Sequence, residues 1–182
     1  MSATVCFCHG RESGPWGTKI RRLAHVAERC GCRVASLDDR DTQDPDQRVQ
    51  RLVAAAADFS SPLILVGSSM GGYVAAAASP RLQPAGLFLM APAVGLPGYL
   101  VEQPQVTAHR VSIVHGWHDD IVPVGNVLEF ARAQGATLHL LEDGHALHGS
   151  LDVIAMLFAD FLATCLGRTR PVVPGRELIA AL

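Results

Sequence analysis

A serine with a glycine two positions away on each side constrains this chain more than any other feature. Ser69 lies between Gly67 and Gly71, and the segment Gly67–Gly71 directly follows the apolar run Leu63–Val66 and directly precedes the alanine-rich stretch Gly72–Ser79. This order of strand, serine and helix predicts a sharp, strained turn with Ser69 at its tip. The glycines are required because the backbone segments on either side of such a turn approach closely. The serine hydroxyl is then exposed at the end of a strand, near the positive end of a helix dipole.

Apolar runs of strand length alternate with segments of helical periodicity along the chain. The predicted strands are Thr4–Cys8, Arg33–Leu37, Leu63–Val66, Gly86–Met90, Val111–Val114 and Thr137–Leu141. The predicted helices are Thr18–Cys30, Pro45 to about Phe59, the stretch after Ser69, Pro123–Gln134 and a last segment that carries Ile154 to Cys165. Asp44 and Gln47 are expected to form a capping box, and Pro80 is expected to mark the end of the helix after Ser69.

The strands are apolar on both faces, which is typical of a parallel sheet covered by helices. The regular alternation predicts an α/β protein, a three-layer α/β/α sandwich around a parallel six-stranded sheet. With 182 residues, the chain is expected to form a single domain over residues 1–166. Residues 167–182 are expected to form a C-terminal tail packed on the body or on a partner. Ligands of such sheets bind at the edge where the strands end.

Composition excludes several functional classes. Fifteen basic and seventeen acidic residues give a net charge of -2, which argues against nucleic-acid and membrane-surface partners. The apolar runs are too short to cross a membrane, and the N-terminus lacks the pattern of a secretory leader, so a cytoplasmic protein is predicted. The five cysteines are expected to be reduced, because their spacing fits neither disulfides nor zinc. No metal and no cofactor are expected.

Two later loops carry the side chains that a serine nucleophile requires. A serine hydroxyl is a weak nucleophile at neutral pH and needs a base within hydrogen-bond reach. When a serine occupies this kind of turn, an acid and then a histidine follow it on loops after later strands. Asp119 follows the strand Val111–Val114, and His145 follows the strand Thr137–Leu141. Ser69, Asp119 and His145 are therefore the predicted nucleophile, acid and base.

Four motifs in a fixed order give the chain a family resemblance. They are His9-Gly10 after the first strand, G-S-S-M-G around Ser69, H-G-x-x-D-x-x-V-P from His115 to Pro123, and Gly144-His145. With these motifs the chain resembles the α/β-hydrolases, specifically the small single-domain type without a lid. The two antiparallel strands that usually begin this fold have no room before Thr4. The resemblance therefore implies a trimmed sheet.

The resemblance also implies a role for each motif residue. Ser69 would attack an acyl carbonyl, His145 would take its proton, and Asp119 would orient the imidazole. The backbone N–H groups of Met70 and Arg11 would form the oxyanion hole.

Each member of the predicted triad has a neighbouring competitor. Ser68 adjoins the nucleophile but lacks the flanking glycines. The family spacing to Val122-Pro123 favours Asp119 over Asp120, and the preceding Gly144 favours His145 over His148. Ser68, Asp120 and His148 remain the less favoured alternatives for the three roles.

The resemblance implies a serine esterase of the carboxylesterase type, which cleaves small acyl esters through an acyl-enzyme. Residues 91–110 provide only a short segment where a lid usually enters, so an open, shallow site is expected. Glu12, Trp16, Tyr99 and Leu100 are substrate-binding candidates, although the last two could instead cover the edge of the sheet. The alternatives are a thioesterase, a peptidase or a protein-binding module on a hydrolase scaffold, acting as a monomer or a homodimer.

Overall fold

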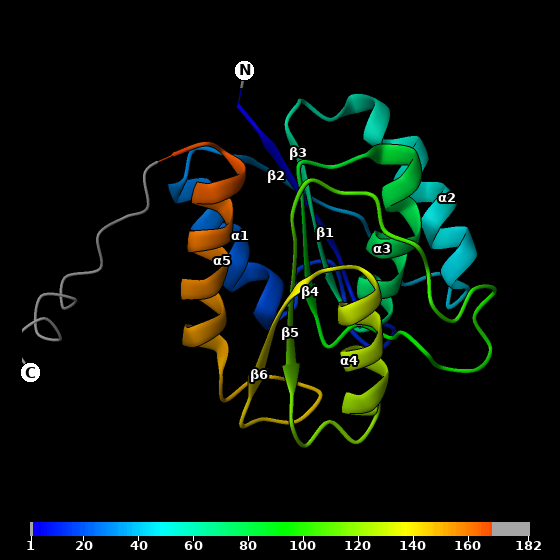
Figure 1. The fold of residues 1–182 in the computed structure, drawn as a ribbon. Helices are drawn as coiled ribbons and strands as arrows, with labels where there is room; N and C mark the ends of the chain where they lie inside the picture. Colours follow the sequence, from blue (N-terminus) through cyan, green and yellow to red (C-terminus); the bar gives the residue numbers. More distant parts are fainter. Residues whose placement is uncertain (1, 169–182) are drawn as a thin grey trace, which may run out of the picture.

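A computed structural model describes residues 2–168 of the chain as a twisted parallel sheet flanked by helices (Figure 1). The sheet of this described part has six strands in the order β2-β1-β3-β4-β5-β6, and every pair of neighbours is parallel. The strands are β1 (Thr4–Cys8), β2 (Arg33–Ser36), β3 (Leu63–Ser68), β4 (Gly86–Met90), β5 (Val111–Gly116) and β6 (Thr137–Leu141). Each predicted strand is present, with ends that differ by at most two residues.

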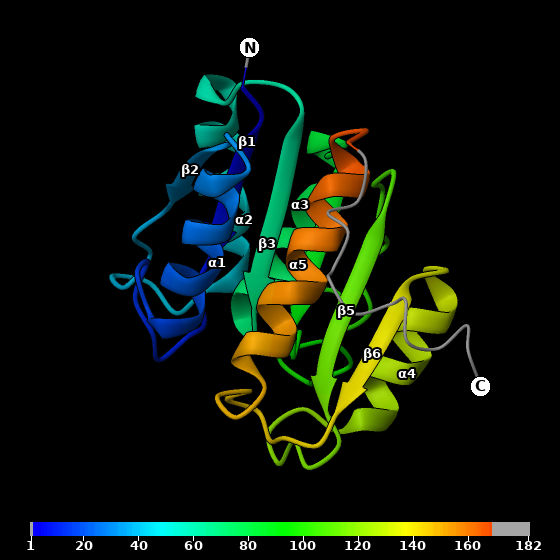
Figure 2. The same cartoon turned by 90° about the vertical axis from the view of Figure 1, so that its left-hand side faces the viewer.

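Helices cover both faces of the sheet, which confirms the three-layer α/β/α sandwich. They are α1 (Thr18–Arg29), α2 (Pro45–Ala55), α3 (Met70–Leu82), α4 (Val124–Ala133) and α5 (Leu151–Cys165), with a 3-10 turn, η1 (Ala56–Asp58), after α2. Helices α1 and α5 lie on one face, and α2, α3 and α4 lie on the other (Figures 1 and 2). None of the described helices combines the length and apolar character needed to cross a membrane.

Each face of the sheet has its own hydrophobic core. On the side of α1 and α5, the Phe88 ring packs against Phe158 with a centroid distance of 5.1 Å. On the other side, Leu65 and Leu89 are fully buried beneath α3, together with Tyr73 of that helix. Burial on both faces explains why the central strands are apolar throughout rather than alternating.

The order of the strands reverses direction at β1, which makes a topological switch point between β1 and β3. The chain passes from β1 to the outer strand β2 and then returns across β1 to β3. The helices that follow β1 and β3 therefore lie on opposite faces, α1 on one and α3 on the other (Figure 2). A ligand site is expected at such a switch point, beyond the carboxyl ends of the two strands. His9-Gly10 and Ser69 lie at these two ends.

Two local expectations are wrong. Helix α3 does not end at Pro80 but continues to Leu82. Proline has no N–H to donate to the carbonyl of Ala76, and the hydroxyl of Ser79 donates to that carbonyl instead, at 2.7 Å. This replacement bond, and the position of the proline in the last turn, allow the helix to continue.

The second concerns the start of α2. Asp44 caps the helix by accepting from the N–H groups of Asp46 and Gln47, but the Asp44 N–H donates to Thr42 rather than to the Gln47 side chain. The reciprocal half of a capping box is therefore missing.

The predicted boundary between domain and tail falls near the end of the described residues. Helix α5 ends at Cys165, and a turn follows it. Residues 169–182, which make up most of the expected tail, lie outside the described residues.

Candidate active site

Ser69 occupies a strained turn between β3 and α3. Its φ of 54° and ψ of -121° lie in a region that residues other than glycine rarely adopt. The turn is held by its own backbone, because the Ser69 N–H donates to Met90 and the Ser69 carbonyl accepts from Ala93. Strain of this kind persists only where the surrounding structure imposes it.

The two flanking glycines are required by close backbone contacts. A Cβ on Gly67 would overlap the backbone of Gly71 and Gly72 at the start of α3. A Cβ on Gly71 would overlap the carbonyl groups of Cys8 and His9 at the end of β1. The second glycine therefore serves the contact between α3 and β1 rather than the contact with β3.

The structure brings Ser69, His145 and Asp119 into one hydrogen-bonded row. The His145 Nε2 lies 2.9 Å from the Ser69 Oγ, and its Nδ1 lies 2.8 Å from the Asp119 Oδ2. An ionised carboxylate only accepts, so the imidazole carries its proton on Nδ1. Nε2 is then free to accept the proton of the serine hydroxyl. Three loops that are far apart in sequence supply these groups, after β3, β5 and β6.

The Asp119 carboxylate is fully buried and held by several donors. Its Oδ1 accepts from the backbone N–H groups of Ile121 and Val122, at 2.9 Å and 2.8 Å. His115 lies next to it, with Nε2 at 3.6 Å from Oδ2, and contacts the carbonyl of Val122 at 3.1 Å. Burial lowers the pKa of His115, which keeps this ring neutral beside the carboxylate. The carboxylate is thereby fixed in one orientation.

The competing residues lie outside this row. The hydroxyl that contacts His145 belongs to Ser69, whereas Ser68 is the last residue of β3. Asp120 is exposed, next to the buried carboxylate. His148 lines the same cavity as His145 but belongs to the loop before α5.

The two backbone N–H groups predicted to form the oxyanion hole follow the strands β3 and β1. Met70 is the first residue of α3, directly after Ser69, and Arg11 follows His9-Gly10 at the end of β1. In the described part of the chain neither N–H donates to another group. Both residues line one cavity with Ser69.

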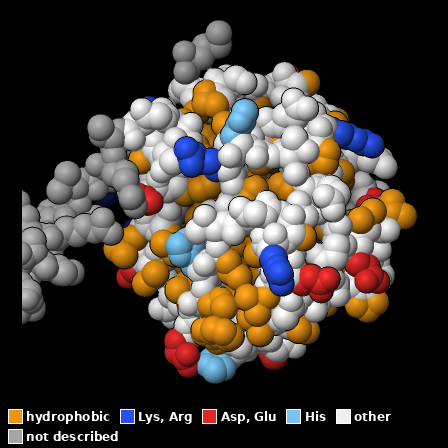
Figure 3. Space-filling model, in the orientation of Figure 1, with side chains coloured by type: hydrophobic (Ala, Val, Ile, Leu, Met, Phe, Trp, Pro, Cys, Tyr) orange, Lys and Arg blue, Asp and Glu red, His pale blue; other side chains and the backbone are white. Residues whose placement is uncertain are grey.

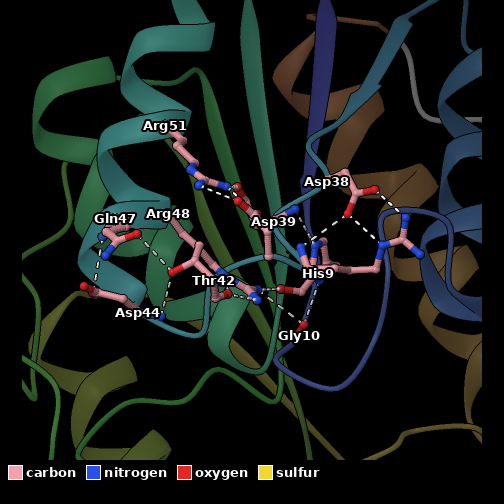
Figure 4. Close-up of polar contacts among 11 residues, drawn as sticks. His9, Gly10, Asp38, Asp39, Thr42, Asp44, Gln47, Arg48 and Arg51 are labelled. Atoms are coloured by element: carbon pink, nitrogen blue, oxygen red, sulfur yellow. Dashed lines mark hydrogen bonds and ion pairs between the residues drawn. The ribbon is translucent and has the colours of Figure 1, made fainter.

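A buried arginine holds the loop that carries Arg11 (Figure 4). Arg48 of α2 is only 1% exposed, and its Nη1 donates to the carbonyls of His9 and Gly10 at 3.3 Å and 3.4 Å. Its Nε and Nη2 donate to the carbonyl of Thr42. The guanidinium thus joins the loop after β1 to the loop before α2.

His9 contributes a second bond to the same carbonyl (Figure 4). Its Nε2 accepts from the N–H of Asp39 at 3.1 Å, so the proton must be on Nδ1, which donates to the Gly10 carbonyl at 2.7 Å. The Gly10 carbonyl and the Arg11 N–H belong to the same planar peptide and point in opposite directions. Fixing the carbonyl therefore fixes the direction of the N–H.

A cavity of about 740 Å³ lies next to Ser69 and His145. Its apolar lining includes Ile20, Leu96, Pro97, Tyr99 and Ile121. Two of the predicted substrate-binding residues, Glu12 and Tyr99, line the cavity as well. The other two are not among the residues that line it: Trp16 is 41% exposed and Leu100 is 80% exposed.

Hydrophobic side chains also gather on the surface at this edge of the sheet, near the end of β5 (Figure 3). Trp117 and Ile121, in the loop after β5, are both more than half exposed. Ile121 connects this surface with the cavity, which is consistent with an open site.

Sequence reasoning missed Arg48 and Lys19. Arg48 gave no signal, because an arginine on an amphipathic helix is ordinarily exposed. Lys19 lines the cavity from the first turn of α1 and did offer a signal, since it is the only lysine of the chain.

Comparisons with known proteins agree with the fold. Residues 4–105, more than half of the chain, match the family described as "Uncharacterised protein family (UPF0227)". A crystal structure of an α/β superfamily protein from Xanthomonas campestris pv. campestris is 35% identical, with a TM-score of 0.83, and covers 89% of this chain and 99% of that chain. No curated protein matches the sequence.

Two further solved structures share the fold at lower identity. A lidless α/β serine hydrolase from Xanthomonas campestris is 21% identical, with a TM-score of 0.69, and covers 94% of this chain and 84% of that chain. An esterase from Pyrococcus furiosus is 18% identical, with a TM-score of 0.77, and covers 90% of this chain and 82% of that chain.

The fold, the strained serine turn and these similarities define an α/β hydrolase without a lid. The chain belongs to the α/β hydrolase superfamily and to the family UPF0227.

Proposed function

We propose that this protein is a serine esterase that hydrolyses small acyl esters through an acyl-enzyme on Ser69. The observation that carries the proposal is the row in which His145 contacts both Ser69 and Asp119. The Ser69 Oγ attacks the ester carbonyl while its proton passes to the His145 Nε2. The charge that develops on the carbonyl oxygen is stabilised by the N–H groups of Met70 and Arg11.

The same groups complete the reaction. The imidazolium gives its proton to the leaving alcohol as the tetrahedral intermediate collapses to the acyl-enzyme. Water then attacks the acyl group, losing a proton to His145, and Ser69 is released as its hydroxyl. The Asp119 carboxylate stabilises the imidazolium in both halves and remains ionised throughout.

The test is a series of 4-nitrophenyl esters with increasing acyl length, assayed together with a thioester and a peptide. Residues 91–110 contain no helix or strand that could form a lid, and a site without a lid is expected to prefer short acyl chains. Activity should peak at short esters and disappear in Ser69→Ala. A peak at long chains would contradict the open site, and turnover of the thioester or the peptide alone would replace the esterase by one of those activities. A partner protein bound by a folded but inactive chain would favour a binding module.

Arg48 is expected to act as a positioning residue for the oxyanion hole. Its bonds to the loop after β1 orient the Arg11 N–H, and loss of one oxyanion donor costs about 100-fold in kcat. Arg48→Met should therefore lower kcat by about 100-fold with little change in KM. Arg48→Lys, which keeps the charge but loses the planar fork, should give an intermediate loss.

The control for this prediction is Arg132→Met, on the exposed surface of α4. Rates are expressed per folded protein, and the folded fraction of each variant is measured by circular dichroism and thermal unfolding, so that partial unfolding does not mimic a loss of kcat. An Arg48→Met protein with unchanged kcat would show that the loop holds its orientation without the guanidinium.

A further inference from the structure

Lys19 is an exception in the composition of the chain. It is the only lysine, whereas the other fourteen of the fifteen basic residues are arginines. It lies in the first turn of α1 and lines the cavity that contains Ser69 and His145. The single lysine of the protein is thus at the candidate active site.

Stability of the helix does not explain this position. A cation near a helix N-terminus is disfavoured by the helix dipole. The first turn of α1 contains no acidic residue to offset it, and Gly17 at the N-cap provides no side-chain bond. A lysine here costs helix stability rather than adding to it, so its role must be sought in the cavity.

The ammonium group of Lys19 has no direct counter-ion among residues 2–168. Within the described residues Lys19 takes part in no ion pair or hydrogen bond, and its side chain is only partly exposed. Burial lowers its pKa, and the more distant carboxylates of Asp119 and Asp143 act in the opposite direction. Both carboxylates are already engaged, Asp119 by His145 and Asp143 by the N–H groups of Gly144 and Ser150. A partly desolvated cation without a partner gains free energy when an anion binds next to it.

The remaining lining of the cavity defines the ligand. Arg11 and Glu12, which are both exposed, carry opposite charges that cancel. Lys19 therefore gives the lining of the cavity a net charge of one positive unit. The rest of the lining is mainly apolar, with Leu96, Pro97 and Tyr99. A single ammonium group beside an apolar wall matches one carboxylate at the end of a short carbon chain.

We propose that Lys19 binds a carboxylate of the substrate and so directs the enzyme towards acyl esters that carry a negative charge. This inference rests on the proposed esterase function and names its substrate class. The charged group anchors the substrate in the cavity by a charge-assisted hydrogen bond, while the ester carbonyl lies at Ser69. Lys19 then contributes to specificity and takes no part in the chemical step.

Paired substrates test the proposal. The 4-nitrophenyl monoester of adipic acid is compared with the same ester of monomethyl adipate, which lacks the charge. A second pair, 4-acetoxybenzoate and its methyl ester, puts the carboxylate on the alcohol side. In at least one pair the wild type should prefer the charged ester. Lys19→Met should lower kcat/KM for it by about 10- to 100-fold through KM and change the neutral ester by less than about twofold.

Two further variants make the kinetic result specific. Lys19→Arg should retain most of the preference, because it keeps the charge. Arg21→Met removes an exposed cation from the same helix and should leave both pairs unchanged. Equal losses for charged and neutral esters in Lys19→Met would mean that the lysine acts on the catalytic groups, which overturns the proposal. Equal rates for both members of each pair in the wild type would also overturn it and leave the esterase proposal intact.

A binding measurement decides the matter without turnover. Because Lys19 is the only lysine, an amine-reactive reagent modifies one side chain, which peptide mapping distinguishes from the N-terminal amine. Adipate should slow this modification in both the wild type and Ser69→Ala, and dimethyl adipate should not. Absence of protection by adipate would overturn the carboxylate site even if no ester were hydrolysed.

Discussion

Ser69→Ala is expected to lower kcat for short esters by about 10⁴- to 10⁶-fold while the fold is retained. The substitution removes the oxygen that forms the acyl-enzyme, and no other hydroxyl contacts His145 in the described residues. An alanine fits in place of the serine, because only the Oγ is lost. Stopped-flow release of nitrophenolate measures both the burst and the steady rate.

Ser68→Ala is the matched control, since it removes a hydroxyl from the adjacent residue. Its rate should stay within about tenfold of the wild type. A large loss in Ser68→Ala together with a small loss in Ser69→Ala would transfer the nucleophile to the neighbouring residue and refute the assignment.

Asp119→Asn is expected to lower kcat by about 10⁴-fold. The Oδ1 of Asp119 accepts two backbone N–H groups, so the amide oxygen of an asparagine would take that position. The amide NH₂ would then face His145 and donate to its Nδ1. The imidazole would be forced to carry its proton on Nε2, where it could no longer accept the proton of Ser69.

The exposed neighbour provides the control for this prediction. Asp120→Asn removes a similar charge and should change kcat by less than about twofold, because its side chain lies outside the hydrogen-bonded row. Equal effects of the two substitutions would mean that the charge of the loop matters rather than the tautomer of His145.

The motifs of the candidate site could be recognised in the sequence because each consists of residues that are close together along the chain. The apolar runs defined the strands, and parallel strands bring their following loops to one edge. Ser69, Asp119 and His145 could therefore be expected together, although Asp119 and His145 follow Ser69 by 50 and 76 residues. Glycines at 67 and 71 followed from the close backbone contacts of the turn.

The features that escaped prediction depend on contacts between distant segments. Arg48 reaches the carbonyl of His9 across 39 residues, and nothing in the neighbourhood of either residue indicates that contact. The continuation of α3 through Pro80 depends on the rotamer of Ser79. Trp16 and Leu100 are on the predicted loops but are not among the residues that line the cavity, because the direction of a loop side chain is set by packing rather than by its sequence position.

Labelling of the native protein with a fluorophosphonate probe, followed by peptide mapping, tests the central claim most directly. Such probes react only with a serine whose base and oxyanion donors are already in position, so the reaction reports the assembled site without knowledge of the substrate. The account predicts one adduct in the wild type, on Ser69, and no adduct in Ser69→Ala. In Asp119→Asn the adduct should form much more slowly than in the wild type. A folded protein that stays unlabelled, or one in which the adduct lies on another residue, would contradict it.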